Sequence, residues 1–260
     1  MLAVWREALG TVALVNLTTA RLAAFRDELA TRQNRAGEPL SGSTVNRHLT
    51  ALSAVLRVTV REYGWLQRNP MANVTRLEDS KGRERFLSDG ERARLLEQCD
   101  ASPCAPLATV VRLALATGAR KSELLGLEWS TVDLNRRLVR FLDTKNGESR
   151  TVPLAAVAVD ALKTWKRGRV PAGAVFPHAK TEIDIAWRAA RDAAKLQDVR
   201  FHDLRHSAAS YLAMSGASLM DIAAILGHKT LAMVKRYSHL SEQHTTAAVD
   251  RMASRFLSEG

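Results

Sequence analysis

One feature limits the possible folds more than any other. Apolar residues recur at helical spacing over most of the chain, and β-type sequence is confined to one short stretch. After the N-cap candidates Thr18 and Thr19, three large apolar residues follow at that spacing: Leu22, Phe25 and Leu29. A longer helix is predicted to begin at the caps Ser43 and Thr44, and its apolar face carries Val45, Leu49, Leu52, Leu56 and Val60. The sequence therefore predicts a helical domain over residues 1–80.

A change of pattern after this domain predicts a boundary near residue 84. The stretch DSKGRERF at residues 79–86 has no apolar period, so residues 81–86 are expected to form a basic linker that contains Lys81 and Arg83. Ser88 and Glu91 then form a capping box that opens a new helix. A second domain is expected over residues 87–260.

The β-type sequence lies in this second domain. Short strands are predicted at residues 138–143 and 149–153, and Asn146-Gly147 between them is a strong hairpin signal, which places Lys145 beside the tip of the turn. Ser218 with Asp221 forms another capping box, and Gly227 is a natural helix stop. Five helices are expected near residues 155–167, 180–195, 203–215, 219–226 and 230–237. The predicted fold is mainly α with a small β-sheet or hairpin.

Charge suggests a class of partner. The chain has 38 Lys and Arg against 27 Asp and Glu, a formal charge of +11. A basic folded chain fits a polyanion, with nucleic acid first and an anionic membrane surface second, or it is simply a basic soluble protein. The face opposite the apolar one on the longer helix is polar and includes Asn46. Three arginines on this face either meet solvent or contact a DNA groove: Arg47, Arg57 and Arg61.

Cysteine usage and the N-terminus bear on the compartment. Cys99 and Cys104 form no CxxC pair, and two cysteines in 260 residues cannot make a disulfide scaffold. Arg6 and Glu7 interrupt the first apolar stretch, so no signal peptide is visible, and no run reaches the length of a membrane span. We expect a soluble cytoplasmic protein.

Four places in the second domain carry groups suited to chemistry: Arg120 with Glu123, His202 to His206, His228, and Tyr237. A Thr-Gly-Ala turn precedes Arg120, and Glu123 follows one helical turn later. His202 and Arg205 share a helix face, as an i, i+3 pair, and could hold the oxygens of a phosphoryl group together with a second arginine. His202 and His206 also have the spacing of a zinc-binding helix, but the acid between them is Asp203 and no third ligand follows.

In this order and spacing, the sequence resembles the tyrosine recombinase (phage integrase) family over nearly the whole chain. The resembling stretches are ATGARKSELLGLEW, TKNGESRTVPL, HDLRHSAASYLAMSG, DIAAILGHKT and VKRYSHL. The N-terminal stretch STVNRHLTALSAVLRVTVREYGWLQRNPM is similar to the family's helical core-binding domain. The resemblance implies a two-domain DNA clamp that joins this domain to an α+β catalytic domain. It also implies that the first domain is abbreviated at its start or that the chain is a fragment.

The resemblance further implies a role for each matching residue. Tyr237 would attack a scissile DNA phosphate, and Lys145 would protonate the departing 5′ oxygen. Arg120 and Arg205 would clamp the nonbridging oxygens, with Glu123 in support. His202 and His228 would hydrogen-bond the phosphoryl group. His206 and His239 match family positions too, and structural or supporting roles are expected for them.

The implied partner is double-stranded DNA, bound by a homotetramer that forms from protomers that are monomeric in solution. No metal and no cofactor are implied, because the Arg-His-Lys set supplies the charge that a metal would supply. Two alternatives remain: a type IB-like topoisomerase, which shares the nucleophile, and a non-catalytic regulator, because Ser218 to Tyr237 resembles a helix-turn-helix.

Overall fold

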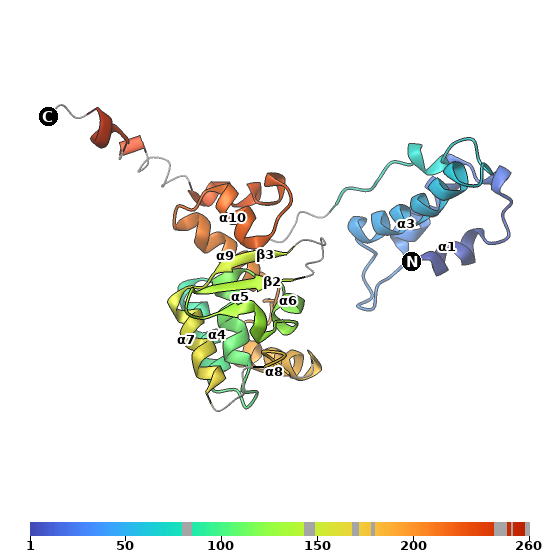
Figure 1. Cartoon of the computed structure of the whole chain (residues 1–260). Coiled ribbons are helices and arrows are strands. Elements are labelled where there is room, and N and C mark those ends of the chain that lie inside the picture. The colour runs from blue at the N-terminus through green and yellow to red at the C-terminus, as the bar shows by residue number, and fades with distance from the viewer. Residues whose placement is uncertain are drawn as a thin grey trace. The chain divides into compact units, whose positions relative to one another are not determined.

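A computed structural model of the chain describes residues 1–79, 85–142, 149–167, 172–177, 180–241, 249–250 and 252–257. Its contacts divide the chain into two units, Met1–Arg83 and Glu84–Gly260 (Figure 1). Each unit has its own hydrophobic core, so each is described by itself. The fold is mainly helical with one small antiparallel sheet, as the sequence predicts.

The first unit is helical. Its α-helices are α1 (Leu2–Leu9), α2 (Thr19–Thr31) and α3 (Gly42–Arg61), and short 3₁₀ turns form η1 (Leu14–Asn16) and η2 (Pro70–Asn73). Thr18 caps α2 as predicted, by accepting a hydrogen bond from the Arg21 backbone. The N-cap of α3 is Ser41, two residues before the predicted cap Ser43, because the side chain of Ser41 accepts from the Thr44 backbone. The core gathers Trp5, Leu22, Phe25, Leu49, Leu52, Leu56 and Met71.

One residue of the expected polar face of α3 has a structural role instead. Asn46 is only 6% exposed. Its amide donates to the Leu77 carbonyl at 2.8 Å and accepts from the Leu77 N–H at 3.0 Å. Asn46 therefore holds the segment that leads out of this unit against α3, since a buried amide must find partners.

The second unit packs around α5 (Leu107–Thr117), which contacts α4 (Asp89–Asp100), α7 (Ala156–Lys166), α8 (Lys180–Ala193) and α9 (Asp203–Met214). Most of α5 is apolar and buried on several sides, as expected of a central helix. The short helix α6 (Lys121–Leu125) follows it, and α10 (Leu219–Leu226) packs on α9. The predicted capping boxes at Ser88 and Ser218 are both present.

The sheet has three antiparallel strands in the order β1 (Val132–Asp133), β2 (Leu138–Phe141) and β3 (Arg150–Pro153), with η3 (Trp129–Thr131) before them. The sequence predicts β2 and β3 but not β1, which is two residues long and has no alternation to detect. Phe141 pairs with Arg150 at the end of the hairpin ladder. The predicted turn with Lys145 lies outside the described residues.

The helix predicted at residues 230–237 is absent from this part of the structure. Two 3₁₀ turns, η4 (Leu231–Met233) and η5 (Lys235–Ser241), take its place. Val234 and Tyr237 lie three residues apart, and both are buried against α9 and α10. A 3₁₀ turn has three residues per turn, so it presents both to the core. None of the helices in the described ranges has the length and apolar character needed to cross a membrane.

Candidate active site

Arg205 lies at the centre of a cluster of cationic groups in the second unit. The residue is on the first turn of α9 and is only 4% exposed. Its Nη1 donates to the Gly118 carbonyl at 2.7 Å, whereas its buried Nη2 has no hydrogen-bond partner among the described residues. Burial, then the charges of Arg120 and Arg150, lower the pKa of Arg205 to about 10. A buried cation that lies beside two others and has an unused hydrogen-bond donor is suited to bind an anion.

The turn that receives Arg205 requires glycine. Gly118 ends α5 with φ +60°, a left-handed conformation that side chains rarely adopt. A Cβ at this position would also collide with the Leu226 side chain of α10. Glycine therefore lets the end of α5 approach α10, and the chain then leads directly to Arg120.

Glu123 joins two arginines to this cluster. The Glu123 side chain, only 4% exposed, accepts from Arg120 Nη1 at 2.6 Å and from Arg150 Nη2 at 2.7 Å. Its Oε2 also accepts from the Arg120 backbone at 2.8 Å. Burial raises the pKa of Glu123, but the hydrogen bonds from Arg150 and Arg120 outweigh it and hold the pKa at about 2. Glu123 is therefore ionised and fixes the orientation of the Arg120 guanidinium.

Arg150 is the member of this cluster that the sequence analysis missed. Besides its bond to Glu123, its Nε donates to the Ile225 carbonyl at 3.0 Å, and its guanidinium lies over the Phe141 ring at 4.7 Å. Its Nη1 is buried and lacks a partner within the described chain. A signal was available, because side chains alternate along a strand and Arg150 shares its face with buried Val152. An arginine at an inward position implies a buried partner.

Two histidines border the cluster. His228 follows the left-handed Gly227 that ends α10 as predicted, and burial, then the charges of Arg205 and Arg120, lower its pKa to about 4. Its Nδ1 is buried, and none of the described groups hydrogen-bonds to it. His202 lies at the more exposed side, where partial desolvation and then the Arg205 charge lower its pKa.

Tyr237, in η5, lies beside the first turns of α9. It is 4% exposed, and its Oη lies 2.6 Å from Nδ1 of His206. The His206 ring also meets the His202 ring edge to face, with centroids 5.3 Å apart. Tyr237 affects the pKa of Arg205, so the phenol and the cationic cluster share one electrostatic environment.

The structure thus brings together most of the predicted site residues: Arg120, Glu123, His202, Arg205, His228 and Tyr237. Three others, Lys145, Lys81 and Arg83, lie outside the described residues. The predicted DNA contacts Arg47, Arg57 and Arg61 are exposed on α3 of the first unit.

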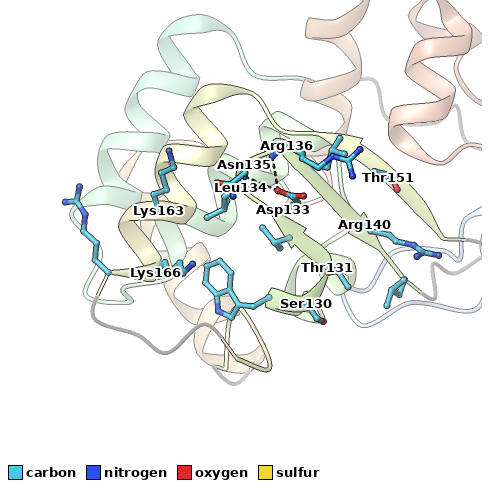
Figure 2. A pocket seen from close by; sticks show the side chains of 15 residues that line it. Ser130, Thr131, Asp133, Leu134, Asn135, Arg136, Arg140, Thr151, Lys163 and Lys166 are labelled. Carbon is cyan, nitrogen blue, oxygen red and sulfur yellow. Dashed lines mark hydrogen bonds between the residues drawn. The ribbon is translucent and has the colours of Figure 1, made fainter.

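A cavity of about 980 Å³ lies elsewhere on the second unit, and no predicted site residue lines it. Figure 2 shows Lys163 and Lys166 of α7 on one side of it and Arg140 of β2 on the other. Arg140 and Thr151 are the exposed residues of their strands, so this cavity borders the outer face of the sheet. Arg150 lies on the inner face, which separates the cavity from the cationic cluster.

The cluster has the composition of a site for phosphoryl chemistry. Three buried nitrogens of this cluster lack partners in the described part of the chain, on Arg150, Arg205 and His228, and each can donate to an anionic oxygen. A phenol that can act as a nucleophile lies beside them. Within the described ranges no group of three or more His, Cys, Asp or Glu could hold a metal ion.

Comparison with known proteins agrees with the motif order. Residues 85–244, more than half of the chain, match the profile of the phage integrase family. This chain belongs to that family. The Shufflon-specific DNA recombinase of Escherichia coli is 35% identical over 236 residues, which cover 90% of this chain and 61% of the recombinase. The chain spans about three fifths of the length of this recombinase and of the phage integrases that match next.

Solved structures support the same fold. The catalytic domain of bacteriophage HP1 integrase matches with a TM-score of 0.55 and 32% identity, over 67% of this chain and 98% of that domain. A lambda integrase(75-356) dimer bound to a COC′ core site matches with a TM-score of 0.71 and 21% identity, over 93% of this chain and 87% of that one. At that identity the second match concerns the fold alone.

Proposed function

We propose that this protein is a tyrosine-type site-specific DNA recombinase. It cleaves and rejoins DNA through a 3′-phosphotyrosyl intermediate and exchanges strands through a Holliday junction. The observation that carries the proposal is the placement of the Tyr237 phenol beside a buried cationic cluster whose donors on Arg205 and His228 lack partners. Membership of the phage integrase family supports the same reaction.

Arg120 and Arg205 hold the nonbridging oxygens of the scissile phosphate in this proposal. A DNA phosphodiester carries a negative charge that repels nucleophiles, and charge builds on the nonbridging oxygens as phosphorus is attacked. Glu123 accepts one hydrogen bond from the Arg120 backbone and one from the Arg120 guanidinium, and so keeps the guanidinium in place. His202 and His228 donate to the same phosphoryl group. Because charge builds on the nonbridging oxygens during attack, the arginines bind the transition state more strongly than the ground state, and this difference lowers the barrier.

Tyr237 is the nucleophile and Lys145 the general acid. The 5′ oxygen is a poor leaving group as an alkoxide, so a positioned ammonium that protonates it accelerates cleavage. The phosphotyrosyl bond conserves the energy of the cleaved linkage, so rejoining requires no nucleotide cofactor. No metal is required in this scheme, because the arginines neutralise the phosphate and the histidines hydrogen-bond to it.

The two units form a clamp around DNA in this proposal. Residues 1–80 act as a core-binding domain, residues 81–86 as a basic linker that includes Lys81 and Arg83, and residues 87–260 as the catalytic domain. Arg47, Arg57 and Arg61 supply an exposed basic face on α3 for phosphate contacts. Four protomers assemble on DNA from free monomers. Exposed apolar side chains near the C-terminus, on Val249, Met252, Phe256 and Leu257, are available for contacts between protomers.

A covalent trap tests the reaction. The protein is incubated with a nicked duplex that carries the flanking DNA of its own element, so that the cut end diffuses away, and the products are denatured. We expect protein attached to DNA in the wild type, equally in EDTA, and none with Tyr237→Phe. Sequence-selective binding by both proteins without covalent product would contradict the proposal and favour the regulator alternative.

The alternatives differ in what they need from the chain. A helix-turn-helix regulator needs a recognition α-helix after Gly227, but two 3₁₀ turns occupy that place. A type IB-like topoisomerase shares the cleavage step and relaxes supercoiled DNA as a monomer. Recombination between two linear substrates, scored by the exchanged product lengths, distinguishes it from the recombinase.

A further inference from the structure

We propose that His206 is the general base that accepts the phenolic proton of Tyr237 as the tyrosine attacks the phosphate. The proposal rests on the assignment of Tyr237 as the nucleophile. The carrying observation is direct contact: His206 Nδ1 lies 2.6 Å from Tyr237 Oη, a short hydrogen bond between the attacking atom and a basic nitrogen. A general base must lie within this reach of the proton it removes.

The protonation state of His206 allows this role. Burial is the largest cause that lowers the pKa of the His206 imidazole, His202, Arg236 and Arg205 lower it further, Asp203 opposes them, and the resulting pKa is about 4. At neutral pH the ring is therefore uncharged, so Nδ1 can accept a hydrogen bond from the phenol. The tautomer that carries its proton on Nε2 gives Nδ1 this acceptor role, and the phenol, with an unperturbed pKa of about 10, holds the proton to be donated at neutral pH.

The groups around His206 would change its basicity when DNA binds. From its own helix it meets His202, Asp203 and Arg205; from η5 it meets Tyr237 and Arg236. His228, after α10, is coupled to it electrostatically. Most of these neighbours are cations or histidines, so a phosphodiester placed among them offsets the charge that makes His206 weakly basic. His206 thus becomes a stronger base at the moment when the substrate is in place.

The proton balance of the cleavage step is complete with this assignment. The Oη–P bond forms as the phenolic proton passes to His206 Nδ1, and the P–O5′ bond breaks as the 5′ oxygen receives a proton from the general acid. In rejoining, the 5′-hydroxyl attacks phosphorus, and the His206 imidazolium returns its proton to the departing phenolate. His202 keeps the separate role of holding the phosphoryl oxygens.

The test compares two substitutions in the full-length protein on the nicked duplex, with the rate of covalent attachment as the readout. His206→Asn keeps an acceptor near the position of Nδ1 but is not basic. With natural tyrosine we expect this variant to form the covalent product at least about 100-fold more slowly than wild type, the usual contribution of a general base. Met214→Asn, which changes an exposed residue at the other end of the same helix, α9, is the control and should react at the wild-type rate.

A fluorinated tyrosine at position 237 distinguishes a base from a structural support. Its phenol is more acidic and needs less help to lose its proton, so the deficit of His206→Asn should shrink several-fold with this residue and as pH rises toward 10. A deficit that is the same with both tyrosines and at every pH would overturn the proposal, as would a wild-type rate with natural tyrosine. If Tyr237→Phe still attached to DNA, the proposed nucleophile itself would be wrong, which separates the two failures.

Discussion

The two halves of the candidate active site differ in how their polar groups are satisfied. On the side of the cations, buried nitrogens of Arg150, Arg205 and His228 lack hydrogen-bond partners in the described structure. On the side of the nucleophile, Tyr237 is buried and its hydroxyl lies in hydrogen-bond contact with His206. Unsatisfied buried donors cost about 1–3 kcal/mol each, so the first half carries a penalty that the second half avoids.

This difference indicates a division of labour. The cationic half is organised in advance for an anion that the folded chain does not supply, as expected where catalysis depends on preorganised charge. The tyrosine half is organised around a neutral hydrogen bond that protects the phenol until substrate arrives. Removing a buried cation such as Arg205 should therefore lower activity without lowering stability, whereas a substitution that breaks existing buried hydrogen bonds should lower both.

The largest effect is expected for Arg205→Gln. Removing a donor to the transition-state charge costs about 100- to 1,000-fold in rate, so covalent attachment to the nicked duplex should fall at least that far. Stability should be unchanged or higher, because a buried cation is removed from beside Arg120 and Arg150. Urea denaturation measures the second quantity. A variant that loses activity only because it is unfolded would refute the idea that Arg205 is maintained for function.

Arg150→Gln should lower both quantities. Glu123 would lose one of its two arginine partners, and α6, β3 and the end of α10 would lose a shared link. We expect about 1–3 kcal/mol lower stability, as for a broken buried hydrogen bond, and cleavage about tenfold slower. Arg140→Gln, on the outer face of the neighbouring strand, is the matched control and should stay within about 0.5 kcal/mol of wild type. Equal losses of stability in the two variants would show that the buried hydrogen bonds of Arg150 do not stabilise the fold.

The neutral histidines predict an acid-sensitive fold. His206 and His228 have folded-state pKa values of about 4, below the ordinary 6.5. The unfolded chain therefore binds protons first as pH falls below about 6.5, and stability is lost between that pH and about 4. From pH 7.5 to 5.5 we expect a loss of about 1 kcal/mol per histidine. Glu123 contributes only below its ordinary pKa of 4.5.

Urea denaturation at those two pH values measures this loss. A double variant, His206→Asn with His228→Asn, should show a smaller change than wild type, because neither replacement titrates. The same pH dependence in both proteins would mean that other groups cause the acid sensitivity.

The smallest effect concerns the first unit. If Arg57 and Arg61 contact DNA phosphates, changing each to Gln should reduce the slope of log affinity against log salt by about 0.9 per lost contact. The cleavage rate at saturating protein should stay constant, because these residues lie in the unit without the cluster. Filter binding from low to moderate salt measures the slope, and an unchanged slope would assign the two arginines to solvent.

Local signals explain which residues could be predicted from the sequence. Arg120 follows a glycine turn, Arg205 and His202 begin a helix, and His228 follows a helix stop. Each therefore has a recognisable position without knowledge of its neighbours. The family resemblance then grouped these positions. In the structure, the predicted residues Arg120, His202, Arg205 and His228 lie in one cluster.

Residues whose roles depend on distant partners could not be predicted in the same way. Asn46 looked like part of a polar face, but Leu77, far along the chain, decides that it is buried. The role of Arg150 depends on its hydrogen bonds to Glu123 and Ile225, which are distant in the sequence. The contact of His206 with Tyr237 depends on a 3₁₀ turn that periodicity does not predict. Tertiary packing thus overrode the local pattern at these positions.

The central claim is that Tyr237 bonds to DNA from among these cations, and peptide mapping tests it most directly. The covalent product from the nicked duplex is digested with nuclease and trypsin, and the modified peptide is sequenced by mass spectrometry. Cleavage after Arg236 and Arg251 isolates residues 237–251. We expect a nucleotide on Tyr237 of this peptide. A nucleotide on Ser238, Tyr211 or any other residue would contradict the account.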